Sequence, residues 1–369
     1  MSEYLEIIKT SFIFFPVIAF IFTIPYILIQ YHKYGSIYYL RVIIVYSFIL
    51  YLLTAYFLVV LPLPSIETVS KLTTPTTQLI PFKFVQDFIN ETSLSITNIH
   101  TYIKALLEPC FYVVIYNILL CLPFGIYMHY YFKKSLKKTV LCTFLLSLFF
   151  ELTQLTGLYF IYPRGYRLFD VDDLILNTFG GLLGYYIGKL FIKILPNRDR
   201  IDEKSYQLGH KVSFLRKLVA LNIDLFLLAA TISILSIFTA NRYLYYFLII
   251  VYYILIPIIT NGKTLSYIFL NLKIDGNDIK SKKYQILVRQ ILWLLEMVLP
   301  MLLIEIIDKY ISNLSITYIL LITLIIFNYY LIILIKVFLK KTLIYEKLSK
   351  THIVSTINEK LEKDKKITD

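Results

Sequence analysis

The stretch Glu151–Gly188, ELTQLTGLYFIYPRGYRLFDVDDLILNTFGGLLGYYIG, determines how the rest of the chain is interpreted. It contains an acid and an amide within an apolar segment, then a polar hairpin, then a second apolar segment with regularly spaced glycines. An ionisable side chain inside a membrane-spanning helix is costly enough that it marks a functional site by default. The stretch therefore predicts two membrane helices joined by a functional polar hairpin.

The composition around this stretch is that of an integral membrane protein. Hydrophobic residues make up 58% of the 369 residues, whereas soluble domains contain roughly 45–50%. The formal net charge of +13 would suit nucleic-acid binding in a soluble domain, but the basic residues lie mainly between the apolar segments. The positive-inside rule and anionic lipid headgroups explain this distribution, so we expect no nucleic-acid partner.

A transmembrane helix needs about 20 predominantly apolar residues. This length predicts an all-α integral membrane protein with about nine transmembrane helices in two bundles, five followed by four. The predicted spans are Ser11–Tyr31, Arg41–Leu61, Pro109–Phe132, Thr139–Phe160, Leu174–Leu195, Leu218–Thr239, Leu244–Thr260, Ile291–Ile311 and Ser315–Val337. A turn signal at Asp275–Gly276 is compatible with a small cytoplasmic hairpin in the second bundle.

The predicted domains follow from these spans. They are a transmembrane domain over residues 1–195, a cytoplasmic linker over 196–214, a second transmembrane domain over 215–340 and a charged cytoplasmic tail over 341–369. Lys and Arg residues gather in alternate connections, which places the N-terminus outside and the C-terminus in the cytoplasm. Abundant Ile, Lys, Tyr and Asn suggest an A+T-rich bacterial genome, and therefore a bacterial plasma membrane.

The longest outer connection, residues 62–108, is a candidate amphipathic surface segment. Phe82, Val85 and Ile89 would face lipid or the protein core, whereas Lys83 and Asp87 would face water. The alternative is an ordinary outer loop.

Glu151 and Gln154 are three residues apart and so lie on the same side of their predicted helix. A carboxylate buried at this depth needs a cation or a proton. Arg164 and Arg167 are the nearest cations in the hairpin, and Arg167 is the preferred partner. Glu151 is therefore either a functional group or one half of a structural ion pair.

Three aspartates, Asp170, Asp172 and Asp173, come immediately before the next predicted helix. Carboxylates at this position cap free backbone N–H groups and lie at the favourable end of the helix dipole. One cap needs one acid, so the cluster is also a candidate binding site, together with Asn177 one turn further on. In the same helix, Gly180, Gly184 and Gly188 form a small-residue ridge that allows close helix packing, with the Glu151 helix as the expected neighbour.

These residues resemble the core signature of VanZ-like membrane proteins, whose founding member is associated with teicoplanin resistance. The resemblance covers about Arg41–Leu195 and rests on ELTQ at Glu151, RLFDVDDLILNTFGGLLGY at Arg167, QLIPFKF at Gln78 and NILLCLPFGIYM at Asn117. It implies an envelope function and transfers the family pattern onto Glu151, Gln154, Arg167, Asp170, Asp173, Asn177 and Gly181. It does not imply a particular reaction.

The second half resembles the RDD family, which is named for one arginine and two aspartates. The matching residues are Arg216, Asp224 and Asp275, with GKTL at Gly262–Leu265 and Arg289. Asp224 is a second intramembrane acid, with Arg216 or Arg289 as its expected partner. Glu296 follows Arg289 by two turns and completes a second polar site, and Trp293 is expected at a membrane interface.

Three functions remain open at this level. The first is a non-enzymatic envelope protein that binds a membrane lipid headgroup or a lipid-linked cell-wall precursor at an outer-leaflet polar site, contributing to teicoplanin-type glycopeptide resistance. The alternatives are a cation or proton transporter that uses the intramembrane acids, and an acid/base enzyme acting on a lipid. No nucleotide-binding, metal-hydrolase or nucleophile-elbow motif is present, so we expect no metal and no cofactor and favour a role other than catalysis.

Overall fold

The computed structural model describes residues 2–95, 97–192, 195–239, 241–276, 282–310, 316–339 and 341–358. The chain divides into two compact units. Unit 1 comprises Met1–Thr23 and Tyr39–Ile201, and unit 2 comprises Ile24–Tyr38 and Asp202–Asp369. Helix α1 (Ser2–Tyr34) and helix α10 (Arg198–Gly209) therefore contribute residues to both units. The domain limits expected from the sequence stay a prediction.

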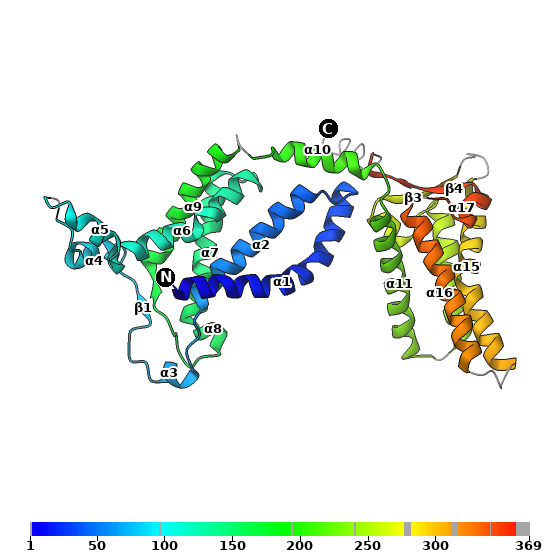
Figure 1. The fold of residues 1–369 in the computed structure, drawn as a ribbon, viewed down its shortest axis with the longest axis horizontal. Helices are drawn as coiled ribbons and strands as arrows, with labels where there is room; N and C mark the ends of the chain where they lie inside the picture. The colour runs from blue at the N-terminus through cyan, green and yellow to red at the C-terminus, as the bar shows by residue number, and fades with distance from the viewer. Residues whose placement is uncertain are drawn as a thin grey trace. The chain divides into compact units, whose positions relative to one another are not determined.

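Unit 1 is mainly helical. Its further elements are α2 (Tyr39–Val60), α3 (Ile66–Ser70), β1 (Thr77–Gln78), α4 (Lys83–Glu91), α5 (His100–Leu106), α6 (Pro109–Tyr130), α7 (Leu136–Leu155), α8 (Gly157–Phe160), β2 (Phe169–Asp170) and α9 (Val171–Phe191). Helices α6, α7 and α9 pack together (Figure 1). The short elements α3, β1 and α4 belong to the long connection between α2 and α6.

Unit 2 is helical with one small sheet. Its elements are α11 (Phe214–Ser236), α12 (Arg242–Ile250), the π-helical turn η1 (Val251–Leu255), α13 (Ile256–Ile259), α14 (Leu265–Phe269), β3 (Leu272–Gly276), α15 (Lys282–Tyr310), α16 (Ile316–Phe338), α17 (Ile344–Ser349) and β4 (Thr351–Ser355). Residues 341–358, at the start of the predicted tail, thus form a helix and a strand of this unit.

Apolar helices of membrane-spanning length dominate the described residues. Five are long and apolar enough to cross a membrane: Leu5–Tyr34, Tyr39–Val60, Pro109–Tyr130, Leu136–Leu155 and Phe214–Ser236. Two shorter apolar helices are Tyr243–Ile259 and Thr323–Phe338. The chain is therefore a helical, multi-pass membrane protein, whereas the count of nine spans stays a prediction. Ile311 and Ser315, which bound the last two predicted spans, lie outside the described residues.

The glycine ridge of α9 faces α6, so the expectation that it packs on the Glu151 helix was wrong. A Cβ on Gly180 would meet the carbonyl oxygen of Ile118, and a Cβ on Gly184 would meet that of Leu122, both in α6. Gly181, one residue round the helix, faces α7 through Thr143. Successive helical residues point about 100° apart, so one ridge faces one neighbour while the intervening glycine faces another.

Strand β3 also corrects an expectation. It pairs antiparallel with β4, with Leu272 opposite Ser355 and Gly276 opposite Thr351, rather than forming a hairpin at Asp275–Gly276. A turn signal specifies a hairpin only where a second strand follows it, and Lys282 already begins α15. The alternating residues Leu272 and Ile274 are buried, and their partner strand comes from a distant part of the sequence.

The α6–α9 contact predicts that the ridge tolerates no added volume at its centre. We expect Gly184→Ala to destabilise the protein by about 1–3 kcal/mol, because the new methyl group meets backbone atoms that cannot move aside. Gly188→Ala is the matched control, since its methyl group would lie 3.3 Å from the Cβ of His129. Thermal unfolding of the purified full-length protein in detergent compares the two variants, and equal midpoints would contradict the packing argument.

Candidate functional site

Two sequence motifs about ninety residues apart meet in unit 1. Strand β1 of the QLIPFKF motif pairs in parallel with β2 of the RLFDVDD motif, with Gln78 opposite Asp170. The Gln78 side chain adds a hydrogen bond from its Nε2 to Asp170 Oδ1 (3.2 Å). The long connection is thereby joined to the hairpin that precedes α9.

Asp172 fixes the start of the amphipathic helix α4. Its Oδ1 accepts a hydrogen bond from Phe82 N (2.6 Å), and its Oδ2 accepts one from Phe84 N (2.9 Å). Only 4% of Asp172 is exposed, so both carboxylate oxygens are used by the protein itself. A carboxylate at a helix N-terminus satisfies free N–H groups and is favoured by the helix dipole. Helix α4 in turn carries Val85 and Ile89 as exposed apolar residues.

Asp170 connects the same cluster to Glu151. Its Oδ1 accepts a hydrogen bond from Asp172 N (2.8 Å) and so caps α9, while its own N–H donates to Glu151 Oε2 (2.9 Å). Burial raises the pKa of the Asp170 carboxyl above its usual value, and the neighbouring Asp172 carboxylate acts in the same direction. Glu151 is 2% exposed, so its carboxylate serves a backbone group inside unit 1.

The expected ion pair between Glu151 and Arg167 is not formed, which corrects the sequence interpretation. Arg167 donates instead to the carbonyl oxygens of Val59 (2.9 Å) and Leu61 (2.6 Å) at the C-terminal end of α2. Gln154 Nε2 donates to the same Val59 oxygen (3.0 Å). The last carbonyls of a helix lack partners within the helix and carry negative partial charge, so they compete with a carboxylate for the guanidinium group.

Asp173 and Asn177 hold α9 against two different helices. Asp173 Oδ1 accepts a hydrogen bond from Asn117 Nδ2 of α6. Asn177 Nδ2 donates to Ser147 Oγ of α7 (2.9 Å). The two side chains therefore link the three helices of the bundle rather than pairing with each other.

A pocket of about 420 Å³ lies where the connection meets the hairpin. Its walls come from residues 72–83 and from Gly165–Leu168, and they include Gln78, Lys83 and Arg167. Arg167 is engaged by backbone carbonyls. Within the described part of the chain, the exposed Lys83 side chain makes no hydrogen bond or ion pair. Lys83 is near enough to Asp170 to lower the pKa of that carboxyl, against the effect of burial, but it has no direct partner among the described residues, so we call it the free cation at this pocket.

Several residues of this site were absent from the sequence-based selection. Gln78, Lys83, Asn117 and Ser147 all contact or line the polar cluster. Gln78 and Asn117 are the first residues of two of the motifs that carried the family resemblance, so the motif boundaries were the available signal. Ser147 lies in an apolar segment and had no comparable signal.

In unit 2, Arg216 is completely buried and bonded to backbone carbonyls. Its guanidinium donates to the Leu270 oxygen (2.9 and 2.7 Å), the Asn271 oxygen (2.7 Å) and the Gly209 oxygen (2.9 Å). It also donates to Ser355 Oγ (3.2 Å), in the last residue of β4. Arg216 thus ties the start of α11 to the end of α10, to the two residues that precede β3 and to β4.

Asp224 is not paired with Arg216 or Arg289, which corrects the second expected ion pair. Its oxygens accept hydrogen bonds from Tyr252 OH (2.6 Å), Thr264 Oγ1 (2.8 Å) and Ser266 N (3.1 Å). These neutral donors come from η1 and from the start of α14. A buried carboxylate is stabilised by several such donors without a cation.

The other second-half residues are distributed over separate contacts. Arg289 forms an ion pair with Glu346 of α17 (3.2 Å), and Tyr329 OH donates to Glu296 Oε1 (2.9 Å). Asp275 forms an ion pair with Lys282. The five predicted residues of the second half therefore do not gather into one polar site. No group of three or more His, Cys, Asp or Glu side chains among the described residues is arranged to hold a metal ion.

The fold and the site together define a class: a helical, multi-pass membrane protein in which a polar hairpin and a long connection are bonded to one another at the end of a helix bundle. Residues 48–192 match the family model VanZ/LLP1, so this part of the chain is VanZ-like, as the motifs predicted. The RDD-like assignment of residues 215–340 stays a prediction. Comparison with curated proteins found no match, and comparison with solved structures found none.

The Asp172 contacts predict that one carboxylate holds the start of α4. We expect Asp172→Asn to weaken local protection by about 1–3 kcal/mol, because the amide keeps one acceptor oxygen and leaves the other N–H without its partner. Hydrogen–deuterium exchange of peptides containing Phe82 and Phe84 measures the effect. Asp87→Asn makes the same charge change within α4 and should leave these amides protected. Unchanged exchange in Asp172→Asn would show that another contact holds the segment.

The Arg216 contacts predict that a lysine cannot replace it. We expect Arg216→Lys to cost about 2–4 kcal/mol, because an ammonium group cannot reproduce the forked geometry and one or more charge-assisted hydrogen bonds are lost. Lys347→Arg, on the exposed side of α17, exchanges the same two residue types at the surface of the same unit and is the control. Unfolding followed by the fluorescence of Trp293, the chain's single tryptophan, reports on unit 2. If Arg216→Lys unfolded at the same midpoint as the control, the hydrogen bonds from the Arg216 guanidinium would not be needed for the stability of unit 2.

Proposed function

We propose that the VanZ-like region binds the polar headgroup of an envelope lipid or a lipid-linked cell-wall precursor in the pocket beside Lys83. Through this binding it would contribute to teicoplanin-type glycopeptide resistance. The observation that carries the proposal is a pocket of about 420 Å³ bordered by a free lysine and by two motifs that are bonded together. Phosphate and carboxylate groups of such headgroups suit a lysine side chain.

The surroundings of the pocket favour a ligand located at a membrane surface. Helix α4 begins at Lys83 and exposes Val85 and Ile89 on one side, as expected for a helix that lies along a lipid interface. Asp172 attaches this helix to the hairpin, so a lipid-facing surface and the polar pocket are held next to each other. We place the pocket at the outer leaflet because of the charge pattern of the connections.

No observation of similar weight to the Lys83 pocket supports the transporter or the enzyme alternative. Glu151 accepts a hydrogen bond from Asp170 N, and Asp224 accepts three hydrogen bonds from neutral donors. These two acids belong to different compact units. A headgroup-binding role therefore remains the proposal that the described residues favour.

Teicoplanin susceptibility tests the proposal in a strain that lacks this chain. Wild-type protein is expected to restore tolerance, and Lys83→Gln is expected to behave like the empty strain because the free cation of the pocket is lost. Lys71→Gln is the matched control, since Lys71 is a surface residue paired with Glu67 and lies outside the pocket lining. Membrane levels are compared by immunoblot. Full protection by Lys83→Gln at equal levels would contradict the proposal, as would a wild-type protein that restores no tolerance.

A further inference from the structure

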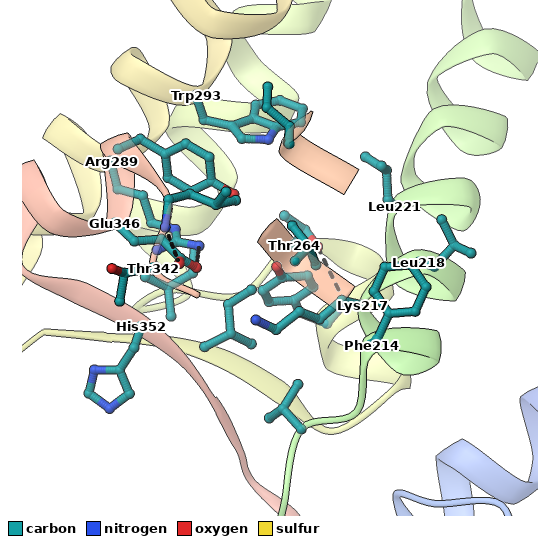
Figure 2. A pocket seen from close by; sticks show the side chains of 18 of the residues that line it. Phe214, Lys217, Leu218, Leu221, Thr264, Arg289, Trp293, Thr342, Glu346 and His352 are labelled. Atoms are coloured by element: carbon teal, nitrogen blue, oxygen red, sulfur yellow. Dashed lines mark hydrogen bonds and ion pairs between the residues drawn. The ribbon is translucent and has the colours of Figure 1, made fainter. Parts of the chain in front are cut away.

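Unit 2 contains a larger cavity of about 670 Å³ between α11, α15 and α16. The loop before α11, helix α17 and strands β3 and β4 close one end of it. Figure 2 shows α11 side chains on one side and α15 side chains on the other, with Lys217 between them. The function proposed for unit 1 does not involve this cavity.

The cavity has a basic end and an apolar end. Along α15 the lining runs from Arg289 through Trp293 to Met297, a rise of roughly 12 Å. Along α11, Phe214, Leu218 and Leu221 share one face with Lys217. Helix α16 contributes the apolar residues Ile333, Leu334 and Val337, and Lys341 follows the end of this helix. A basic residue therefore lies near one end of each wall and apolar residues follow it, although on α11 Asp224 comes after Leu221.

The charges that line the cavity do not balance. Arg289 is paired with Glu346, and Asp224 is satisfied by three donors. Lys211, Lys217 and Lys341 make no side-chain hydrogen bond or ion pair among the residues that the structure describes. Lys217 is also half-buried, and the one carboxylate that acts on it, Glu346, is already paired with Arg289. An ammonium group removed from water is costly unless it is paired with an anion.

We infer that this cavity binds an anionic phospholipid, with its phosphate at Lys217, Lys211 and Lys341 and an acyl chain along the faces of α11, α15 and α16. The excess positive charge accounts for the anionic headgroup. The apolar walls account for the acyl chain, because α11 is an apolar helix of membrane-spanning length and α16 is a shorter apolar helix. A soluble anion would use the lysines but leave these walls uncovered. The site lies within unit 2 and is independent of the function proposed for unit 1.

Trp293 provides a direct test, because it is the only tryptophan in the chain and lines the cavity. The full-length protein is placed in bilayers of phosphatidylcholine that contain acyl-brominated phosphatidylglycerol or, at the same fraction, acyl-brominated phosphatidylcholine. Bromine quenches tryptophan fluorescence on contact. We expect stronger quenching by the anionic lipid, and we expect Lys217→Gln to reduce this preference about fivefold, the attraction of one basic residue for anionic lipid.

Two further variants complete the test. Lys341→Gln should also lower the preference, whereas Lys347→Gln, on the exposed side of α17, should retain it. Equal quenching by both lipids in the wild type overturns the proposal, and so does a preference that survives Lys217→Gln and Lys341→Gln. If glycerol phosphate alone abolishes the selective quenching, the lysines form a site for a soluble phosphate and the lipid assignment is wrong.

Discussion

Both units depend on side chains that satisfy backbone groups where water is scarce. In unit 1, Asp172 accepts two N–H groups at the start of α4, and Arg167 donates to two carbonyls at the end of α2. In unit 2, Arg216 donates to the carbonyls of Leu270, Asn271 and Gly209. A membrane protein has to satisfy backbone polar groups internally wherever its helices break. The charged residues of this chain meet that requirement at its breaks.

This arrangement explains why the expected ion pairs are absent. Glu151 with Arg167, and Asp224 with Arg216, are reasonable pairs if charges seek opposite charges. Glu151 instead accepts one hydrogen bond, from Asp170 N. Arg167, Asp224 and Arg216 each have two or more backbone or hydroxyl partners within 3.2 Å. A buried charge loses its hydration whether or not it is paired, so it needs compensating hydrogen bonds, and here backbone and hydroxyl groups supply them.

The sequence predicted apolar membrane-spanning helices, the VanZ-like region and the acids and Arg167 of the polar cluster, because hydrophobic length and motif order are local properties. It did not predict the partners of those residues. Arg167 meets Val59 and Leu61 across about one hundred residues, and a backbone carbonyl leaves no trace in the amino-acid pattern. Strand β3 likewise looked like half of a local hairpin, because its buried residues Leu272 and Ile274 alternate whatever strand they pair with. The spacing of the glycines in α9 predicted close packing against another helix, but it did not predict that this helix is α6.

Some charged side chains bond to backbone groups of the protein, and others make no hydrogen bond or ion pair within the described residues. This difference indicates which of them are available to bind a ligand. A substitution at Glu151 or Asp172 removes a partner from a backbone N–H, so a lost phenotype would follow from a loosened hairpin as readily as from a lost ligand. Lys83 and Lys217 have no such internal role within the described residues, and each lines a cavity. A cation that makes no hydrogen bond or ion pair within the described residues can pair with an anion that enters the cavity without breaking an internal contact. The acids and Arg167 of the family motifs therefore build the hairpin, and Lys83, within the QLIPFKF motif, is the better candidate for contact with a ligand.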